Sequence, residues 1–150
     1  MVKTVERFRC PECGSAFPVD GRRWHCSCGS YLDLEIEARF PVKQLQTRAP
    51  TLWRYREALP VAREAVLSMG EGCTPMEELS FRGRRAILKI DYLFPTGSYK
   101  DRGATVLVSK LRELGVKKVV EDSSGNAGCA IAAYCARGGI RCGIYVPAST

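Results

Sequence analysis

Histidine is nearly absent from this chain, and other features that would indicate a function are missing altogether. Among 150 residues there is one histidine, His25, which leaves little room for histidine-based catalysis. The longest nearly apolar stretch, residues 127–136, is far shorter than the roughly 20 residues that a membrane-spanning helix needs. The residues after Met1 lack the apolar core of a signal peptide. We therefore expect a cytoplasmic protein with no membrane partner.

Blocks of like charge are also missing, although the chain is basic. Its 23 Lys and Arg residues exceed its 16 Asp and Glu residues, which gives a net charge of +7. This charge is spread along the chain, without the runs that favour nucleic-acid binding, so a nucleic-acid partner is disfavoured. A basic surface still attracts small anionic substrates. With 45% hydrophobic and 26% charged residues, the composition is that of a folded globular protein.

What the chain has in excess is cysteine, with eight residues. In the cytoplasm, cysteines serve as metal ligands, catalytic thiols or buried apolar residues rather than as disulfides. Two pairs, Cys10-x-x-Cys13 and Cys26-x-Cys28, can each direct two thiolates at one ion, and four thiolates satisfy tetrahedral Zn²⁺. We predict a zinc-ribbon-like module over residues 1–37. The alternative is a ribbon of the same shape that keeps reduced thiols.

The other four cysteines lack the spacing of a metal site. We predict that they are buried structural thiols, because free cysteine is among the most buried residue types. They are Cys73, Cys129, Cys135 and Cys142.

The second half of the chain alternates strand-like and helix-like segments. Apolar residues spaced three and four apart predict helices, and short runs rich in valine and isoleucine predict strands. The predicted helices are 101–114 and 126–137, and the predicted strands are 86–91, 117–121 and 141–146. A β-α-β-α-β order at this short spacing predicts an α/β fold with a parallel sheet covered by helices.

This pattern divides the chain into three parts. Residues 1–37 form the cysteine module, which ends in a half-buried strand over 31–37. Residues 38–85 form a linker with short helical and strand segments. Residues 86–150 form part of an α/β lobe. We expect this lobe to be truncated at the C-terminus, because no helix follows the last strand to cover the sheet.

Two loops at strand–helix junctions carry chemical groups. Residues 95–103 (PTGSYKDRG) place Lys100 at the start of a helix, where an amine can react with a carbonyl group, although a surface lysine is the simpler interpretation. Residues 123–128 (SSGNAG) can bind a carboxylate or phosphate through backbone N–H groups at a helix N-terminus. The alternative there is an ordinary N-cap turn. Neither a dinucleotide-binding fingerprint nor a P-loop is present.

Four motifs follow one another along the chain: WRYRE at 53–57, GEGCTP at 70–75, PTGSYKDRG at 95–103 and SSGNAG at 123–128. In these motifs and in their order, the chain resembles the threonine synthases. These are fold-type-II pyridoxal-phosphate enzymes related to the tryptophan synthase β subunit. The resemblance covers nearly the whole chain, and one branch of the family carries an amino-terminal cysteine ribbon. Tyr99 is a mild departure, since the family usually has phenylalanine there.

The resemblance implies roles for residues of the two loops. Lys100 would hold pyridoxal 5′-phosphate covalently and move protons on the substrate, and Asn126 would hydrogen-bond the 3′-oxygen of the cofactor. The reaction implied is that of a lyase, which converts O-phospho-L-homoserine and water into L-threonine and phosphate. The full-length enzyme would be a homodimer. The residues implied in binding the small amino-acid substrate are Thr96, Ser98, Ser123, Ser124, Gly125 and Ala127.

Other readings stay open at this point. Cysteate synthase and threonine dehydratase are related enzymes that perform other replacements or eliminations. A zinc-ribbon module that binds nucleic acid or protein is a second alternative. The family's phosphate cradle and its partner for the pyridine nitrogen match nothing in the 150 residues. We therefore expect the chain to be the amino-terminal part of an enzyme, inactive alone.

Overall fold

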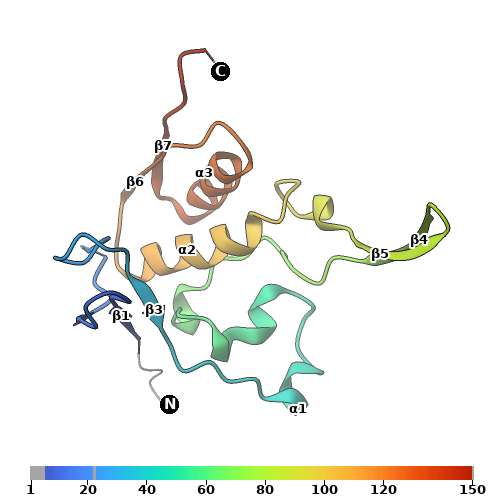
Figure 1. Cartoon of the computed structure of the whole chain (residues 1–150), viewed down its shortest axis with the longest axis horizontal. Coiled ribbons are helices and arrows are strands. Elements are labelled where there is room, and N and C mark those ends of the chain that lie inside the picture. The colour runs from blue at the N-terminus through green and yellow to red at the C-terminus, as the bar shows by residue number, and fades with distance from the viewer. Residues whose placement is uncertain (1–5, 22, 150) are drawn as a thin grey trace.

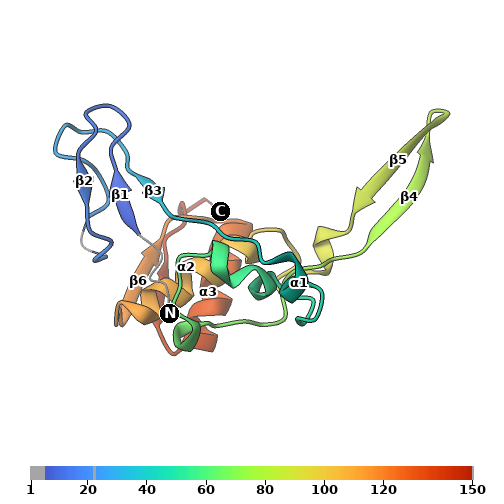
Figure 2. The same ribbon diagram turned by 90° about the horizontal axis from the view of Figure 1, so that it is seen from below.

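The computed structural model describes residues 6–21 and 23–149, so residues 1–5, 22 and 150 of the predicted parts lie outside the described residues. Figures 1 and 2 show a central helical body, with the cysteine-rich module and a long β-hairpin at opposite ends. The three-part division of the chain stays a prediction.

The structure contains short strands, α-helices (α) and 3-10 helical turns (η). In chain order the elements are β1 (Arg7–Arg9), β2 (Ala16–Phe17), β3 (Asp33–Glu35), α1 (Val42–Leu45), η1 (Leu52–Ala58), η2 (Arg63–Ala65), β4 (Met76–Phe81), β5 (Arg84–Lys89), η3 (Asp91–Leu93), α2 (Asp101–Glu113), β6 (Lys118–Glu121), α3 (Asn126–Gly138) and β7 (Arg141–Ile144).

The cysteine-rich module contains a small antiparallel sheet in the order β2-β1-β3. The strand predicted over 31–37 is confirmed as β3, which is shorter. The Glu35 carboxylate on β3 accepts hydrogen bonds from Arg7 and from Arg9 (3.1 Å) on β1. These side chains are more than 40% exposed, and exposed ion pairs contribute little to stability. So small a sheet therefore needs another source of stability.

Residues 38–75 form an irregular segment with the short helical turns α1, η1 and η2. Arg48 donates two hydrogen bonds of 2.6 Å to the Glu57 carboxylate, and this pairing holds the pKa of Glu57 below its ordinary value. Partly buried Val106 of α2 packs against an apolar cluster of this segment. The buried members of the cluster are Trp53, Val61 and Ala65.

The prediction that the strand over 86–91 belongs to a parallel sheet is wrong, because this strand is one arm of the β4–β5 hairpin. The strand predicted over 86–91 exists in part as β5, but it pairs antiparallel with β4 and belongs to a separate two-stranded sheet. The two residues between the strands, Arg82 and Gly83, both have φ > 0, as the turns of tight hairpins require. Every residue of both strands is exposed. This local turn, rather than burial under helices, decides how β5 pairs.

The helical body confirms the rest of the predicted α/β pattern. Both predicted helices are present as α2 and α3. Strands β6 and β7 pair in parallel, with α3 as the crossover between them, so the structure shows a mixed α/β fold with a short parallel pair. Among the described residues, no helix is both long and apolar enough to cross a membrane. The main apolar core lies between α2 and α3, and its buried members are Leu67, Ala104, Val108, Ala130, Ile131, Tyr134, Cys135 and Ile140.

The four cysteines outside the metal pattern do not share one environment. Cys135 is fully buried in the main core and Cys142 is partly buried against it, as predicted. The prediction is wrong for Cys73 and Cys129, which are exposed. Cys129 lies six residues before Cys135 on α3 and so falls on a different face, while Cys73 lies in a surface loop with a φ of 48°.

Candidate active site

The turn before α2 is held by a buried carboxylate next to Lys100. Asp101 is fully buried, and its carboxylate accepts hydrogen bonds from the Thr96 backbone N–H (2.9 Å) and from the Thr96 hydroxyl. The Ser98 hydroxyl oxygen accepts the backbone N–H of Lys100 (3.2 Å). Thr96 and Ser98 thus use their side chains to shape the turn. Lys100 itself is exposed, with its ammonium group 5.2 Å from the centre of the Tyr99 ring.

The SSGNAG loop joins β6 to α3 and presents backbone N–H groups. Gly125 precedes the helix in an extended conformation, and none of the side chains that the structure describes caps the helix, so the alternative of a side-chain N-cap is not found. Within the described residues, the backbone N–H groups of 126–128 donate no hydrogen bond to another backbone group. Such free N–H groups and the positive end of the helix dipole favour an anion. The loop can therefore bind a carboxylate or a phosphate.

Gly128 allows this loop to lie against the first turn of α3. A Cβ atom at Gly128 would lie 2.3 Å from the carbonyl oxygen of Ser123, a distance at which the backbone must move. The loop shape therefore depends on the missing side chain at this position. Gly128 is also buried, so the displaced backbone cannot relax toward solvent at that point.

We predict that Gly128→Ala displaces the loop and weakens anion binding. In the full-length protein, the KM for an amino-acid substrate is expected to rise about 10-fold or more, since each 1.4 kcal/mol of lost binding is tenfold. The measurement is steady-state kinetics with a melting curve. Gly143→Ala on β7 is the matched control, because a Cβ atom there would meet its neighbours at ordinary distances of 3.7 and 3.8 Å. Equal KM values for the two variants would contradict the assignment.

A cavity of about 210 Å³ connects the two loops. It brings Lys100, from the start of α2, together with Ala127, from the start of α3. It also includes Glu121, the last residue of β6, which the sequence prediction missed. Strand alternation offered the signal: Val119 packs against the helical core, so Glu121 lies on the same face of the strand. The lining residues are Lys100, Gly103, Ala104, Leu107, Glu121, Ala127, Ala130 and Ile131.

The other residues predicted to bind cofactor or substrate are not among those that line this cavity. On the SSGNAG loop, Ser124, Gly125 and Asn126 are exposed, whereas Ser123 is partly buried. The Ser123 hydroxyl oxygen accepts the backbone N–H of Gly125 at 3.3 Å. Their roles toward a ligand stay predictions.

The four cysteines of the predicted ribbon converge. Their sulfur atoms all lie within 4.8 Å of one another, with Cys10 and Cys28 3.6 Å apart and Cys13 and Cys26 3.5 Å apart. Tetrahedral zinc with Zn–S bonds of about 2.3 Å would place the sulfurs about 3.8 Å apart. The side chains come from two loops of the module and form no disulfide. Four sulfur atoms in this arrangement can hold one metal ion.

The pKa values of two of these thiols, Cys13 and Cys26, are shifted in opposite directions by their surroundings. Hydrogen bonds with Ser15, and then with the neighbouring thiols, lower the pKa of Cys13 to about 6. A backbone hydrogen bond with Cys28 lowers the pKa of Cys26, but burial and the neighbouring thiols outweigh it and raise the value to about 12. A cation among the sulfurs would favour the thiolate form of each.

A larger cavity of about 330 Å³ lies in the cysteine module, lined by Asp20, Arg23, Trp24 and His25. None of these residues belongs to the two chemical loops. We take the smaller cavity as the candidate active site, because it alone of the two contains Lys100 and the start of α3.

Comparison with known proteins assigns the chain to a family. The model of the family described as pyridoxal-phosphate dependent enzyme matches residues 67–150, which include Lys100 and the SSGNAG loop. The chain belongs to this pyridoxal-phosphate dependent enzyme family. The match begins before the GEGCTP motif and leaves the cysteine module outside.

Relatives within the pyridoxal-phosphate dependent enzymes extend the match toward the amino terminus. Threonine synthase of Methanocaldococcus jannaschii is 37% identical over 93% of this chain, and that of Methanosarcina acetivorans is 36% identical over 94%. Threonine synthase of Halalkalibacterium halodurans is 44% identical over 64% of this chain. The chain covers 37%, 37% and 28% of these three relatives, so it spans about a third of their length.

Proposed function

We propose that the chain is the part of a threonine synthase that carries the reactive lysine. The full-length enzyme would convert O-phospho-L-homoserine and water into L-threonine and phosphate. The observation that carries the proposal is the cavity in which Lys100 meets the N-terminal turn of α3. Similarity to threonine synthases over more than nine-tenths of the chain supports this reaction over other replacements and eliminations. Because the chain spans about a third of those relatives, the activity is proposed for the full-length protein.

The residues present fit pyridoxal phosphate. Lys100 is exposed at the cavity wall and can bond covalently to the cofactor, while Asn126, at the start of α3, would donate to the 3′-oxygen of the cofactor. The cofactor, when bound, supplies an electron sink for the substrate carbons. The N–H groups of the SSGNAG loop would bind the substrate carboxylate.

Proton transfer is proposed for two side chains that line the cavity. Lys100 would move protons at the substrate carbons once its amine is released. Glu121 is the other ionisable lining residue, and no ion pair or hydrogen bond engages its carboxylate within the part of the chain described. It is therefore available to face a substrate. This assignment would explain how a chain with one histidine, placed in the cysteine module, supplies acid–base groups.

The cysteine cluster is proposed to hold a structural Zn²⁺ through Cys10, Cys13, Cys26 and Cys28. Four thiolates form a closed coordination shell without an open position, which is typical of structural rather than catalytic zinc. Among the described residues of the module only Cys10 and Cys26 are buried, so the metal would stabilise it.

The full-length protein is expected to release phosphate from O-phospho-L-homoserine and to form one L-threonine for each phosphate. The measurement is a phosphate assay combined with amino-acid analysis of the same reaction. Release of ammonia from L-threonine, without phosphate chemistry, would instead identify a dehydratase. Formation of cysteate from a phosphorylated substrate and sulfite would identify a cysteate synthase.

A further inference from the structure

Glu71, in the GEGCTP motif, carries a buried carboxylate that the proposed reaction does not use. The residue is 1% exposed. Its carboxylate accepts hydrogen bonds from the Ser68 hydroxyl (3.0 Å), the Met69 backbone N–H (2.8 Å) and the Tyr134 hydroxyl (2.8 Å). The Thr105 hydroxyl lies 2.8 Å from the same carboxylate and 2.6 Å from the Leu67 carbonyl oxygen, so its single proton is shared between these two acceptors. None of the ion pairs among the described residues includes Glu71, and a buried carboxylate that is not ion-paired depends on such donors.

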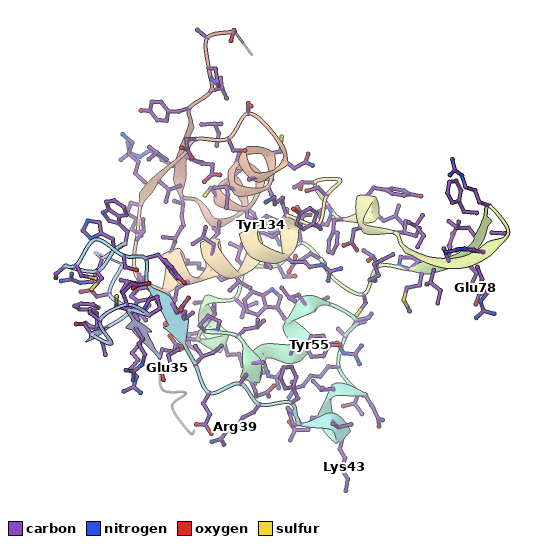
Figure 3. All side chains as sticks on the ribbon, in the orientation of Figure 1. Glu35, Arg39, Lys43, Tyr55, Glu78 and Tyr134 are labelled. Carbon is purple, nitrogen blue, oxygen red and sulfur yellow. The ribbon has the colours of Figure 1, made fainter. Side chains whose placement is uncertain are left out.

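The donors come from three separate parts of the chain. Ser68 and Met69 lie just before the motif, Thr105 lies on α2 and Tyr134 lies on α3. Figure 3 shows Tyr134 at the junction of the two helices. The Thr105 hydroxyl also accepts a hydrogen bond from the Trp53 indole N–H at 3.0 Å. Polar contacts of the Glu71 carboxylate therefore connect α2, α3 and the segment that contains Ser68 and Met69.

This junction adjoins the active-site cavity along both helices. On α3, Tyr134 lies three and four residues after Ile131 and Ala130, which line the cavity, so it continues the same helix face by one turn. On α2, Thr105 directly follows Ala104, another lining residue. The spacing of the helices at the junction thus determines the distance between the cavity walls.

We propose that Glu71 is a positioning residue of the active site: its buried carboxylate ties α2 to α3 and so sets the spacing between Lys100 and the anion-binding loop. Lys100 lies at the start of α2 and the loop leads into α3, so a change in helix spacing moves both partners. The inference rests on the proposed function for its kinetic consequences. Its structural consequence, the orientation of a bound cofactor, does not depend on the identity of the substrate.

The donor from α3 keeps its proton over the working pH range. Burial, and then the hydrogen bond to Glu71, raise the pKa of Tyr134 above its usual range. The phenol therefore stays neutral and donates to the carboxylate. Replacing it by phenylalanine removes this donor while the ring still fills the core.

The test is Tyr134→Phe in the full-length holoenzyme. We expect unchanged cofactor stoichiometry but a weaker visible circular-dichroism band from the bound cofactor, which reports its orientation. We also expect kcat to fall about 10- to 100-fold, the scale of a displacement of about 1 Å between reacting groups. The KM should change less than the kcat, because the N–H groups that would bind the substrate carboxylate move together with α3 and keep their arrangement relative to one another.

Two further comparisons separate positioning from general stability. Ile140→Val trims a buried core residue whose side chain has no hydrogen-bonding group, and it should lower the melting temperature without changing kcat or the cofactor band. Thr105→Val should reproduce the Tyr134→Phe effects, and Thr105→Ser, which retains the hydroxyl, should restore both readouts. Should Tyr134→Phe not fold, the comparison of Thr105→Val with Thr105→Ser decides.

The proposal is overturned if Tyr134→Phe and Thr105→Val change kcat and the cofactor band no more than Ile140→Val does at the same loss of melting temperature. Failure of wild-type protein to act on O-phospho-L-homoserine would reject the proposed reaction, while the cofactor band would still test the role of Glu71.

Discussion

Lys100→Ala is expected to abolish covalent attachment of pyridoxal phosphate in the full-length protein. The absorbance band of a lysine-bound cofactor should disappear, and reduction with borohydride should no longer fix the cofactor to the chain. Phosphate release should fall by at least about 10³-fold, because the variant loses both a covalent anchor and a proton-transfer group. The structure supports this expectation, since Lys100 lines the cavity that reaches the start of α3.

The matched control for Lys100→Ala is Lys43→Ala. Lys43 is an exposed lysine on α1, and Figure 3 shows its side chain pointing away from the helical body. This variant should keep the absorbance band, the borohydride-fixed cofactor and the rate. The fold of Lys100→Ala should survive, because the carboxylate of Asp101, and not the lysine amine, holds the turn. A Lys100→Ala protein that keeps the lysine-linked band would show that another residue carries the cofactor.

Local sequence patterns correctly predicted both helices but not the pairing of the strand over 86–91, which is β5. The apolar spacing along 101–114 and the small-residue run of 126–137 each specify a helix that packs on one core, and both helices are present. The strand at 86–91 has a similar apolar pattern to a central parallel strand. Its pairing is decided by the two residues at 82–83, whose positive φ values fold the chain back on itself. A run of apolar residues does not by itself tell a parallel strand from one arm of a hairpin.

That Lys100 and Ala127 lie together could be predicted because each belongs to a short motif. Lys100 and Ala127 were expected together, and the cavity brings them together. Glu121 was missed because an acidic residue at a strand end is commonly a solvated one. The role of Glu71 could not be predicted, since its partners Thr105 and Tyr134 lie 34 and 63 residues away. Contacts at such separations follow from packing, which a local motif does not encode.

Cys26→Ser in the full-length protein is expected to remove zinc and to unfold the cysteine module. Cys26 is 1% exposed, and its sulfur lies 3.5 Å from that of Cys13, so a shorter, weaker ligand would break a closed shell. Zinc content should fall from about one ion per chain to near zero, measured by atomic emission after gel filtration. Zinc binding contributes on the order of 10 kcal/mol to folding in small zinc modules, far more than the strands of this module can replace. Limited proteolysis should then cut within residues 6–37 first.

The effect of Cys26→Ser at the Lys100 cavity distinguishes a structural metal from a catalytic one. Glu6 forms an ion pair of 2.6 Å with Lys110 of α2, but none of the module's described residues lines the Lys100 cavity. We therefore expect Cys26→Ser to keep the cofactor band while it loses the protease resistance of the module. Cys129→Ser is the matched control, because this exposed cysteine lies outside the cluster and should retain zinc and protease resistance. Wild-type protein that binds no zinc, or a Cys26→Ser variant with an intact and metal-loaded module, would refute the assignment. Equal loss of the cofactor band in Cys26→Ser and Lys100→Ala would show instead that the metal centre supports the active site directly.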